Sequence, residues 1–252
     1  MEWDAPALVL SRRPYGEADV IVRLFYEEHG VLAGLVRGGA SRKQSSLWLP
    51  GNLVASSWRA RLPTQLGYVT GEPIQSIAGR LLDSPLALAL LASEISIADG
   101  GLPEHEAQPV VFAELVRLVT AIGVFADAPP VALAVRWEAS LLAALGYGLT
   151  LDRCAITGDR DDLGYVSPRT GRAVSRAGAG QWIDRLLPLP SFMISSEDDG
   201  TPSDWLQGLQ LTGHFLARHL FGVRHLPLPE ERERLVHLVR RLSEESYCQP
   251  GG

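Results

Sequence analysis

The sequence of 252 residues predicts an α+β protein with a five-stranded barrel at residues 1–80 and a mainly α-helical domain at residues 81–252. Three observations support this prediction. Short runs of alternating apolar residues follow one another closely up to about residue 80. Beyond that point, apolar residues recur at helical spacing. A turn-rich insertion at about residues 150–180 interrupts the helical pattern and predicts a small hairpin.

The first eighty residues contain about five short strands separated by turns. In "DVIVRLFYEE" the even-numbered residues from Val20 to Tyr26 share one face of a strand, and the odd-numbered residues share the other. Pro14 with Gly16, and Gly30 after a histidine, mark turns. Five strands at this spacing fit the oligonucleotide-binding (OB) fold, although the pattern alone does not separate it from an SH3-like barrel.

Five helical segments follow. In "LLDSPLALALLASEISIAD" Ser84 is the expected N-cap and Pro85 the first helical residue. The next two segments, "QPVVFAELVRLVTAIGVFA" and "PPVALAVRWEASLLAALGYG", begin at proline and end near Gly123 or Gly146. After the insertion come "SDWLQGLQLTGHFLARHLFG" and "LPEERERLVHLVRRLSEES", the second of which starts with acidic residues, as the helix dipole favours.

The composition is that of an ordinary globular protein, with 46% apolar and 21% charged residues. No apolar run is long enough to span a bilayer, and the N-terminus is acidic first and basic later, the reverse of a secretory signal. Cys154 and Cys248 lie far apart, so no disulfide framework is indicated. We therefore expect a cytoplasmic protein without membrane contact.

Charge is distributed unevenly along the chain. The formal net charge is -6, yet residues 1–80 hold nine Lys or Arg against seven Asp or Glu, while the remainder holds fourteen against twenty-two. No acidic residue occurs between Glu28 and Glu72. A protein that repels nucleic acid in general but binds it at one place would show this pattern. A solvated sheet edge that uses basic residues to block aggregation would show it too.

Within this acid-free window, cations alternate with aromatic residues, as a groove for single-stranded nucleic acid requires. The candidate DNA-binding residues are Arg37, Arg42, Lys43, Arg59, Arg61 and Trp48. Strand parity predicts that Arg59 and Arg61 project from one face, whereas Trp58 points into the barrel core. Trp48 lies in a loop beside Pro50, where it could either stack on bases or pack inside.

The loop that carries Arg42 and Lys43 begins with Gly38 and Gly39. Because glycine permits many backbone conformations, we expect this loop to be mobile and able to close on a bound strand.

The insertion has the skeleton of a zinc ribbon but lacks its ligands. A structural zinc site needs four Cys or His ligands, and only Cys154 supplies one. The other three ligand positions fall on or near Thr157, Ser175 and Gly178. We therefore expect no metal, and a hairpin whose turns depend on Gly158, Gly171 and local hydrogen bonds.

Other polar clusters do not indicate an enzyme. Asp159, Asp161 and Asp162 fit a solvated acidic turn better than a cation site, and His214 and His219 are five apart and share no helix face. The sequence has no nucleophile elbow and no phosphate-binding loop. We expect no catalytic residues, no cofactor and no enzymatic activity.

Long blocks of the chain resemble the RecO family of bacterial DNA repair proteins, over about residues 2 to 245. The blocks are "EWDAPALVLSRRPYGEADVIVRLFYEEHGVLAGLVRGGASRK", "PGNLVASSWRARL", "RWEASLLAALGYGLTLDRCAITG", "YVSPRTGRAVS" and "LTGHFLARHLF". The resemblance implies an OB domain, a helical domain and a zinc-ribbon-like insertion that binds zinc in some members. The loss of three ligands here departs from the zinc-binding pattern.

The resemblance also implies a recombination mediator that binds single- and double-stranded DNA and anneals complementary strands. With RecR, and in some settings RecF, such proteins help load RecA onto DNA coated by single-strand-binding protein (SSB), whose acidic C-terminal tail they bind through the helical domain. The family's basic OB surface would correspond to the candidate residues named above, and we expect nucleoid association in the cytoplasm.

Two further hypotheses remain. The barrel could serve mainly as a protein adaptor for RecR or SSB, with only incidental DNA contact. A nuclease is disfavoured because no carboxylate cluster lies within the basic window.

Overall fold

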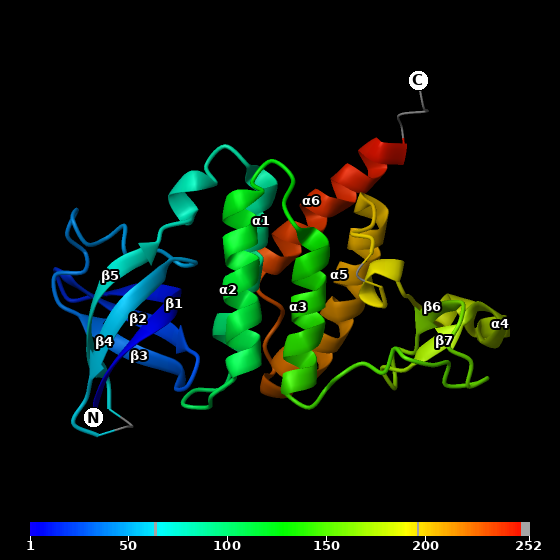
Figure 1. Ribbon diagram of the computed structural model, residues 1–252, viewed down its shortest axis with the longest axis horizontal. Coiled ribbons are helices and arrows are strands. Elements are labelled where there is room, and N and C mark those ends of the chain that lie inside the picture. Colours follow the sequence, from blue (N-terminus) through cyan, green and yellow to red (C-terminus); the bar gives the residue numbers. More distant parts are fainter. Residues whose placement is uncertain (63–64, 196, 248–252) are drawn as a thin grey trace. The chain divides into compact units, whose positions relative to one another are not determined.

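The structure of the chain is a computed structural model that describes residues 1–62, 65–195 and 197–247. The chain forms two compact units, Met1–Pro129 and Pro130–Gly252, which we call the barrel unit and the helical unit. The helices α1 and α2 lie in the barrel unit, although a boundary at residue 80 would assign them to a helical domain (Figure 1).

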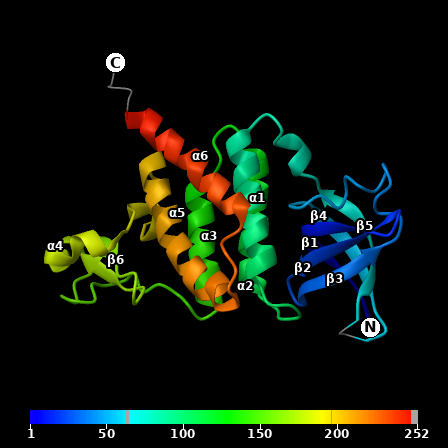
Figure 2. The ribbon, with the colours of Figure 1, turned by 180° about the vertical axis from the view of Figure 1, so that it is seen from behind.

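Five strands of the barrel unit close into a barrel, visible from both sides in Figures 1 and 2. They are β1 (Glu2–Tyr15), β2 (Asp19–Tyr26), β3 (Gly30–Val36), β4 (Leu53–Arg59) and β5 (Gly67–Gln75). The order around the barrel is β1-β2-β3-β5-β4, with β3 and β5 parallel and the other neighbours antiparallel. This order, with β5 between β3 and β4, confirms the predicted five-stranded OB-like barrel.

The barrel core follows the predicted alternation. The even-numbered residues of β2, from Val20 to Tyr26, are all buried inside, together with Trp58 of β4. The Tyr26 hydroxyl hydrogen-bonds to the buried Ser56 hydroxyl at 2.9 Å, and Ser56 in turn donates to the carbonyl of Ala5 at 3.0 Å. Burial of the phenol raises the pKa of Tyr26 to about 12, despite its hydrogen bond with Ser56, so this polar chain remains uncharged.

The outer face of β2 is covered by two helices of the same unit, α1 (Pro85–Gly101) and α2 (Pro109–Val124). Phe25 meets Phe112 of α2 edge to face, with ring centroids 5.3 Å apart. Arg23 donates from Nε to the Asp99 carboxylate of α1 at 2.6 Å and also pairs with Glu104. The predicted cap is confirmed, because the Ser84 hydroxyl accepts from the N–H of Ala87 at the start of α1.

The connection between α1 and α2 passes very close to the start of β3. The N–H of His105 donates to the Val31 carbonyl at 3.1 Å. Gly30 has a φ of +67°, and a Cβ added there would lie 2.2 Å from the Glu106 carbonyl oxygen. Glycine is therefore required at this turn both for its backbone conformation and for the close approach.

The helical unit is built on α3 (Val131–Ala144), α5 (Pro202–Leu216) and α6 (Glu230–Tyr247). The helix α5 packs against both of the others. It starts with a capping box in which Thr201 and Asp204 exchange hydrogen bonds, and it continues into a π-helical turn, Ala217–Phe221.

A fully buried ion pair joins the three helices. Arg232 of α6 donates from Nε and Nη2 to the two carboxylate oxygens of Glu138 on α3, at 2.6 and 3.0 Å. The same guanidinium reaches the Leu209 carbonyl of α5 at 2.7 Å, and the Thr212 hydroxyl of α5 donates to Glu138. Such a pair offsets the cost of burying its charges only when the remaining hydrogen-bonding capacity is also satisfied, as it is here.

The insertion between α3 and α5 forms a three-stranded sheet in the order β7-β6-β8, which extends beyond the predicted limit near residue 180. Its strands are β6 (Leu163–Val166), β7 (Ala173–Ser175) and β8 (Leu187–Pro188). The short helix α4 (Arg176–Ala179) and a 3-10 turn lie between β7 and β8. The two turns that depend on glycine are confirmed, because Gly158 and Gly171 have φ values of +83° and +68°.

The four positions of the expected zinc ligands lie close together beside this sheet, around the Cys154 sulfur. The Cys154 Sγ accepts from the N–H groups of Ile156 and Thr157 at 3.4 Å, and from the N–H and hydroxyl of Ser175 at 3.2 and 3.3 Å. A Cβ added at Gly178 would lie 3.1 Å from this sulfur. These residues do not fit a zinc ion, because only one of the four positions carries a ligand atom of the required kind.

Burial raises the pKa of the Cys154 thiol, but the hydrogen bonds from Ser175 and Thr157 outweigh it and lower the pKa to about 6. An unfolded cysteine has a pKa of about 8.5. Because the folded-state pKa is the lower one, the thiolate adds stability that is fully present above the unfolded value and is lost as the pH falls through about 6.

We predict that replacing Arg232 by alanine lowers the free energy of unfolding by about 3–5 kcal/mol, because the Glu138 carboxylate then stays buried without its partner. The matched control Arg240→Ala, at an exposed position of the same helix, should cost less than about 0.5 kcal/mol. The double change Arg232→Met with Glu138→Leu should recover most of the loss. Urea denaturation followed by circular dichroism measures all three, and an R232A midpoint equal to that of R240A would contradict the prediction.

We also predict that Cys154 titrates as a thiolate with a midpoint near pH 6 and that Ser175→Ala raises this midpoint, because a hydroxyl donor to the sulfur is lost. Ultraviolet absorbance of the thiolate, measured in a Cys248→Ser background, follows Cys154 alone. Ser167→Ala, on the same hairpin, is the control and should leave the midpoint unchanged. A midpoint that does not respond to Ser175→Ala would refute the role of this hydrogen bond.

Candidate nucleic-acid interface

The five predicted cations of the basic window are all exposed, at three places of the barrel unit. Arg37 directly follows β3, Arg42 and Lys43 lie in the long connection from β3 to β4, and Arg59 is the last residue of β4. Arg61 lies beyond the end of that strand, so strand parity does not place it on the face of Arg59.

The connection from β3 to β4 is anchored rather than free. Its Ser45 carbonyl accepts from Arg12 of β1 at 2.6 Å, and the Asn52 amide donates to the carbonyls of Ser46 and Leu47 at 2.9 and 3.1 Å. A Cβ at Gly39 would lie 2.5 Å from a methyl carbon of Val20. Gly39 therefore serves close packing, whereas the mobility that we expect of the part with Arg42 and Lys43 stays a prediction.

The prediction that Trp48 binds DNA requires correction. Its side chain is 0% exposed and belongs to the barrel core, and its Nε1 donates to the Gln44 side chain of the same connection at 3.3 Å. A ring in this position has no free face for a nucleic-acid base. The core position predicted for Trp58 is confirmed, since that side chain is buried and its Nε1 donates to the Ala33 carbonyl at 3.2 Å.

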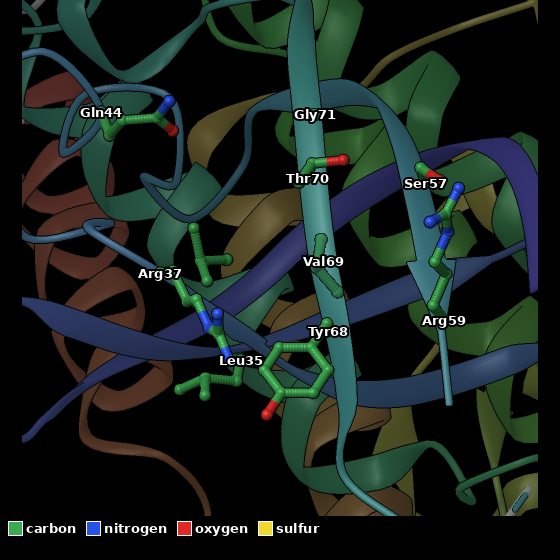
Figure 3. Close-up of a pocket in the computed structure, with 10 residues that line it drawn as sticks. Leu35, Arg37, Gln44, Ser57, Arg59, Tyr68, Val69, Thr70 and Gly71 are labelled. Carbon is green, nitrogen blue, oxygen red and sulfur yellow. The ribbon is translucent and has the colours of Figure 1, made fainter. Parts of the chain in front are cut away.

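A hollow of about 560 Å³ opens on the barrel surface over β3, β4 and β5 (Figure 3). Its lining consists of Leu35, Val36, Arg37, Gln44, Ser57, Arg59, Tyr68, Val69, Thr70 and Gly71. Two of the five predicted cations, Arg37 and Arg59, thus meet at one site, on opposite sides of β5 in Figure 3. The lining does not include Arg42, Lys43 or Arg61.

Tyr68 is the aromatic residue of this hollow. Its ring is half exposed, and the Arg37 guanidinium lies over it at 4.9 Å from the centroid. Tyr68 of β5 is paired with Leu35 on one side and with Arg59 on the other. Sequence analysis missed this residue, although the alternation in "GYVT", with Gly67 and Val69 buried, signals an outward tyrosine.

We call Arg37, Arg59 and Tyr68 the barrel-face triad. Arg59 carries a counter-charge, because its Nη2 pairs with Glu2 of β1. Both side chains of this pair are largely exposed, so the pair is worth about 0–1 kcal/mol. The segment between Glu28 and Glu72 contains no acidic residue, but a carboxylate from another strand lies beside it in the folded structure.

A second depression of about 530 Å³ adjoins the first and shares Ser57, Thr70 and Gly71 with it. Its lining includes Asp4 and Glu72 and no cation. The positive part of this surface therefore ends at the middle of β4 and β5. On another side, the exposed Arg12 and Arg13 of β1 add positive charge that sequence analysis had not assigned to the site.

Within residues 1–62, 65–195 and 197–247, no group of three or more His, Cys, Asp or Glu side chains could hold a metal ion. Asp162 of the acidic turn forms an ion pair with Arg176 at 3.0 Å. No helix in this described part of the chain is long and apolar enough to cross a membrane.

Two family models match the chain. "Recombination protein O N terminal" matches residues 1–77 and "Recombination protein O C terminal" matches residues 82–227. Proteins named "DNA repair protein RecO" are similar over nearly their whole length. The one from Gluconacetobacter diazotrophicus is 52% identical over 100% of this chain and 98% of its own, and the one from Granulibacter bethesdensis is 51% identical over 97% and 98%.

A third relative with that name, from Acidiphilium cryptum, is 47% identical over 96% of this chain and 98% of its own. Together the two family models cover both the OB-like barrel and most of the helical part, in the same order as in the family. The chain therefore belongs to the RecO family of DNA repair and recombination proteins.

Proposed function

We propose that this chain is a recombination mediator in DNA repair, which binds single- and double-stranded DNA on its barrel and anneals complementary strands. Together with RecR it helps load RecA onto SSB-coated DNA, and it contacts the C-terminal tail of SSB. The observation that carries the proposal is the barrel-face triad, which brings two guanidinium groups and an exposed aromatic ring together on an OB-like barrel.

In this proposal the phosphates are bound by Arg37 and Arg59 in the hollow and by Arg42, Lys43 and Arg61 around it. The base-stacking residue is Tyr68 instead of Trp48, because the Tyr68 side chain is half exposed whereas Trp48 is fully buried. Guanidinium groups hold phosphates through two parallel hydrogen bonds, which suits Arg37 and Arg59 to this role.

The ion pair between Arg59 and Glu2 is compatible with this role. An exposed pair contributes little stability, so a phosphate can replace the carboxylate at small cost. Asp4 and Glu72 in the adjoining depression repel phosphates and would keep a strand at the positive end of the surface.

Annealing requires two negatively charged strands to approach each other, and cations that screen the phosphates lower this repulsion. Recognition would be largely independent of sequence, since backbone contacts and stacking carry no base code. No covalent step is needed, so we propose that the protein is not an enzyme and associates with the nucleoid through its DNA contacts.

A second candidate is a protein adaptor whose barrel mainly binds RecR or SSB. The half-exposed Tyr68 and the adjacent Leu35 beside two cations would also suit an acidic, apolar peptide. Replacing the triad cations separates the two functions, because an adaptor would lose partner binding while its DNA affinity and salt dependence stay unchanged.

We predict that Arg37→Ala with Arg59→Ala weakens binding of single-stranded DNA and lowers the slope of log affinity against log salt by about 1.4, which corresponds to two phosphate contacts. Fluorescence anisotropy of a labelled oligonucleotide over a series of salt concentrations measures both quantities. Arg80→Ala with Arg117→Ala is the matched control, because both residues are exposed in the same unit and the net charge changes equally. An equal slope change in this control would rule out a specific site.

We predict that Tyr68→Ala weakens single-strand binding by about 1–3 kcal/mol, the usual worth of stacking on one base. Tyr68→Phe keeps the ring and should bind within about twofold of wild type. Since neither change removes a positive charge, the salt slope should remain that of wild type. The same anisotropy titration tests this, and wild-type affinity for Tyr68→Ala would exclude stacking at this residue.

A further inference from the structure

The helical unit contains a second place where stretches without acidic residues meet. Residues 139–151, 163–183 and 205–229 contain no Asp or Glu. Backbone hydrogen bonds join the first two stretches, from Thr150 to the Gly171 carbonyl and from Ala173 to the Thr150 carbonyl, each at 2.9 Å. The second and third stretches meet at Pro168, whose carbonyl contacts two side chains of α5 and the turn that follows it.

Pro168 lies at the tip of the hairpin turn between β6 and β7. Its carbonyl oxygen accepts from Arg218 Nη1 and from His214 Nε2, both at 3.0 Å. Because a carbonyl can only accept, the Nε2 of His214 carries the proton. The turn that contains Arg169 is thereby fixed to the end of α5.

An aromatic pair lies beside this junction. Tyr147 and His219 stack with ring centroids 4.6 Å apart and planes at 16°, and Tyr147 is exposed. Phe215, buried in the unit, supports His219 from within. Burial, then the electrostatic effects of Arg218 and His214, lower the pKa of His219.

Three exposed arginines come from the segments that meet at this junction. They are Arg169 and Arg172 of the hairpin and Arg218 of the α5 end. Within the described part of the helical unit, none of the three forms an ion pair with a carboxylate, whereas Arg153, Arg176 and Arg241 do. We call Tyr147, His219 and these three arginines the hairpin–α5 surface.

We propose that the hairpin–α5 surface binds the phosphate backbone of a second nucleic-acid strand, apart from the strand held on the barrel face. Guanidinium groups without a carboxylate partner and an exposed aromatic ring, brought together by the same junction, are what a single strand requires for phosphate contact and base stacking. The inference rests on the proposed DNA function and extends it, because a chain with two separate strand sites can hold both partners of an annealing reaction.

The test uses the full-length chain and two non-complementary oligonucleotides that carry a donor and an acceptor dye. Energy transfer reports the simultaneous binding of both strands to one protein. In the variant Arg169→Ala, Arg172→Ala, Arg218→Ala, we expect second-strand affinity to fall about tenfold or more while first-strand affinity stays within about twofold. Annealing of complementary oligonucleotides should slow by a similar factor.

The matched control is Arg160→Ala, Arg234→Ala, Arg240→Ala, which removes the same charge at exposed positions outside the surface. It should bind the second strand like wild type. Because Arg218 also holds the Pro168 turn, the double variant Arg169→Ala, Arg172→Ala repeats the test without touching that hydrogen bond, and circular dichroism verifies folding of each variant.

Second-strand binding that is unchanged in both variants, or reduced equally in the control, overturns the inference while leaving barrel binding intact. If polyglutamate binds wild type and not the triple variant while second-strand binding persists, the surface is a site for an acidic peptide and the inference is wrong. Absence of binding of any strand to wild type would refute the proposed function itself.

Discussion

The candidate interface depends on the position of β5 between β3 and β4. There, Tyr68 lies directly opposite Arg59, and the hollow gathers residues from three separate parts of the chain. This closure leaves no room for side chains at its tightest point, where Gly34 and Gly67 are paired. A Cβ at Gly67 would lie 2.3 Å from the Trp58 ring in the core. The same packing that closes the barrel therefore determines which side chains reach its outer face.

Charge in space differs from charge along the sequence, and the difference limits where a polyanion can lie. Arg59 of β4 forms an ion pair with Glu2 of β1, a residue that is distant in the sequence. The depression next to the hollow has Asp4 and Glu72 in its lining. Arg37 instead lies over an aromatic ring, and it forms no ion pair with a carboxylate among residues 1–62, 65–195 and 197–247. Of the two arginines that line the hollow, the one that pairs with a carboxylate is therefore Arg59, on the β4 side of β5.

What could be predicted from the sequence follows from how local each feature is. The core position of Trp58 follows from parity within one strand, and the Ser84 cap from four consecutive residues, so both were accessible. The burial of Trp48 and the contact of Glu2 with Arg59 depend on pairings between distant segments, which periodicity does not encode. Tyr68 is an intermediate case. The alternation in its strand indicates an outward side chain, but its contacts with Arg37 and Arg59 depend on strand pairing that the sequence does not reveal.

The hairpin of the helical unit shows how a turn can be held without the ligands that its skeleton would need for a metal. At one end, N–H and hydroxyl donors surround the Cys154 sulfur, and a Cβ at Gly178 would lie only 3.1 Å from it. At the other end, Thr150 bridges to Arg172, and Pro168 is held by α5. Because both ends are held by hydrogen bonds, Arg169 and Arg172 project from a hairpin that is anchored on both sides. In the second-strand site that we propose, this anchoring would lower the entropy lost on binding phosphates.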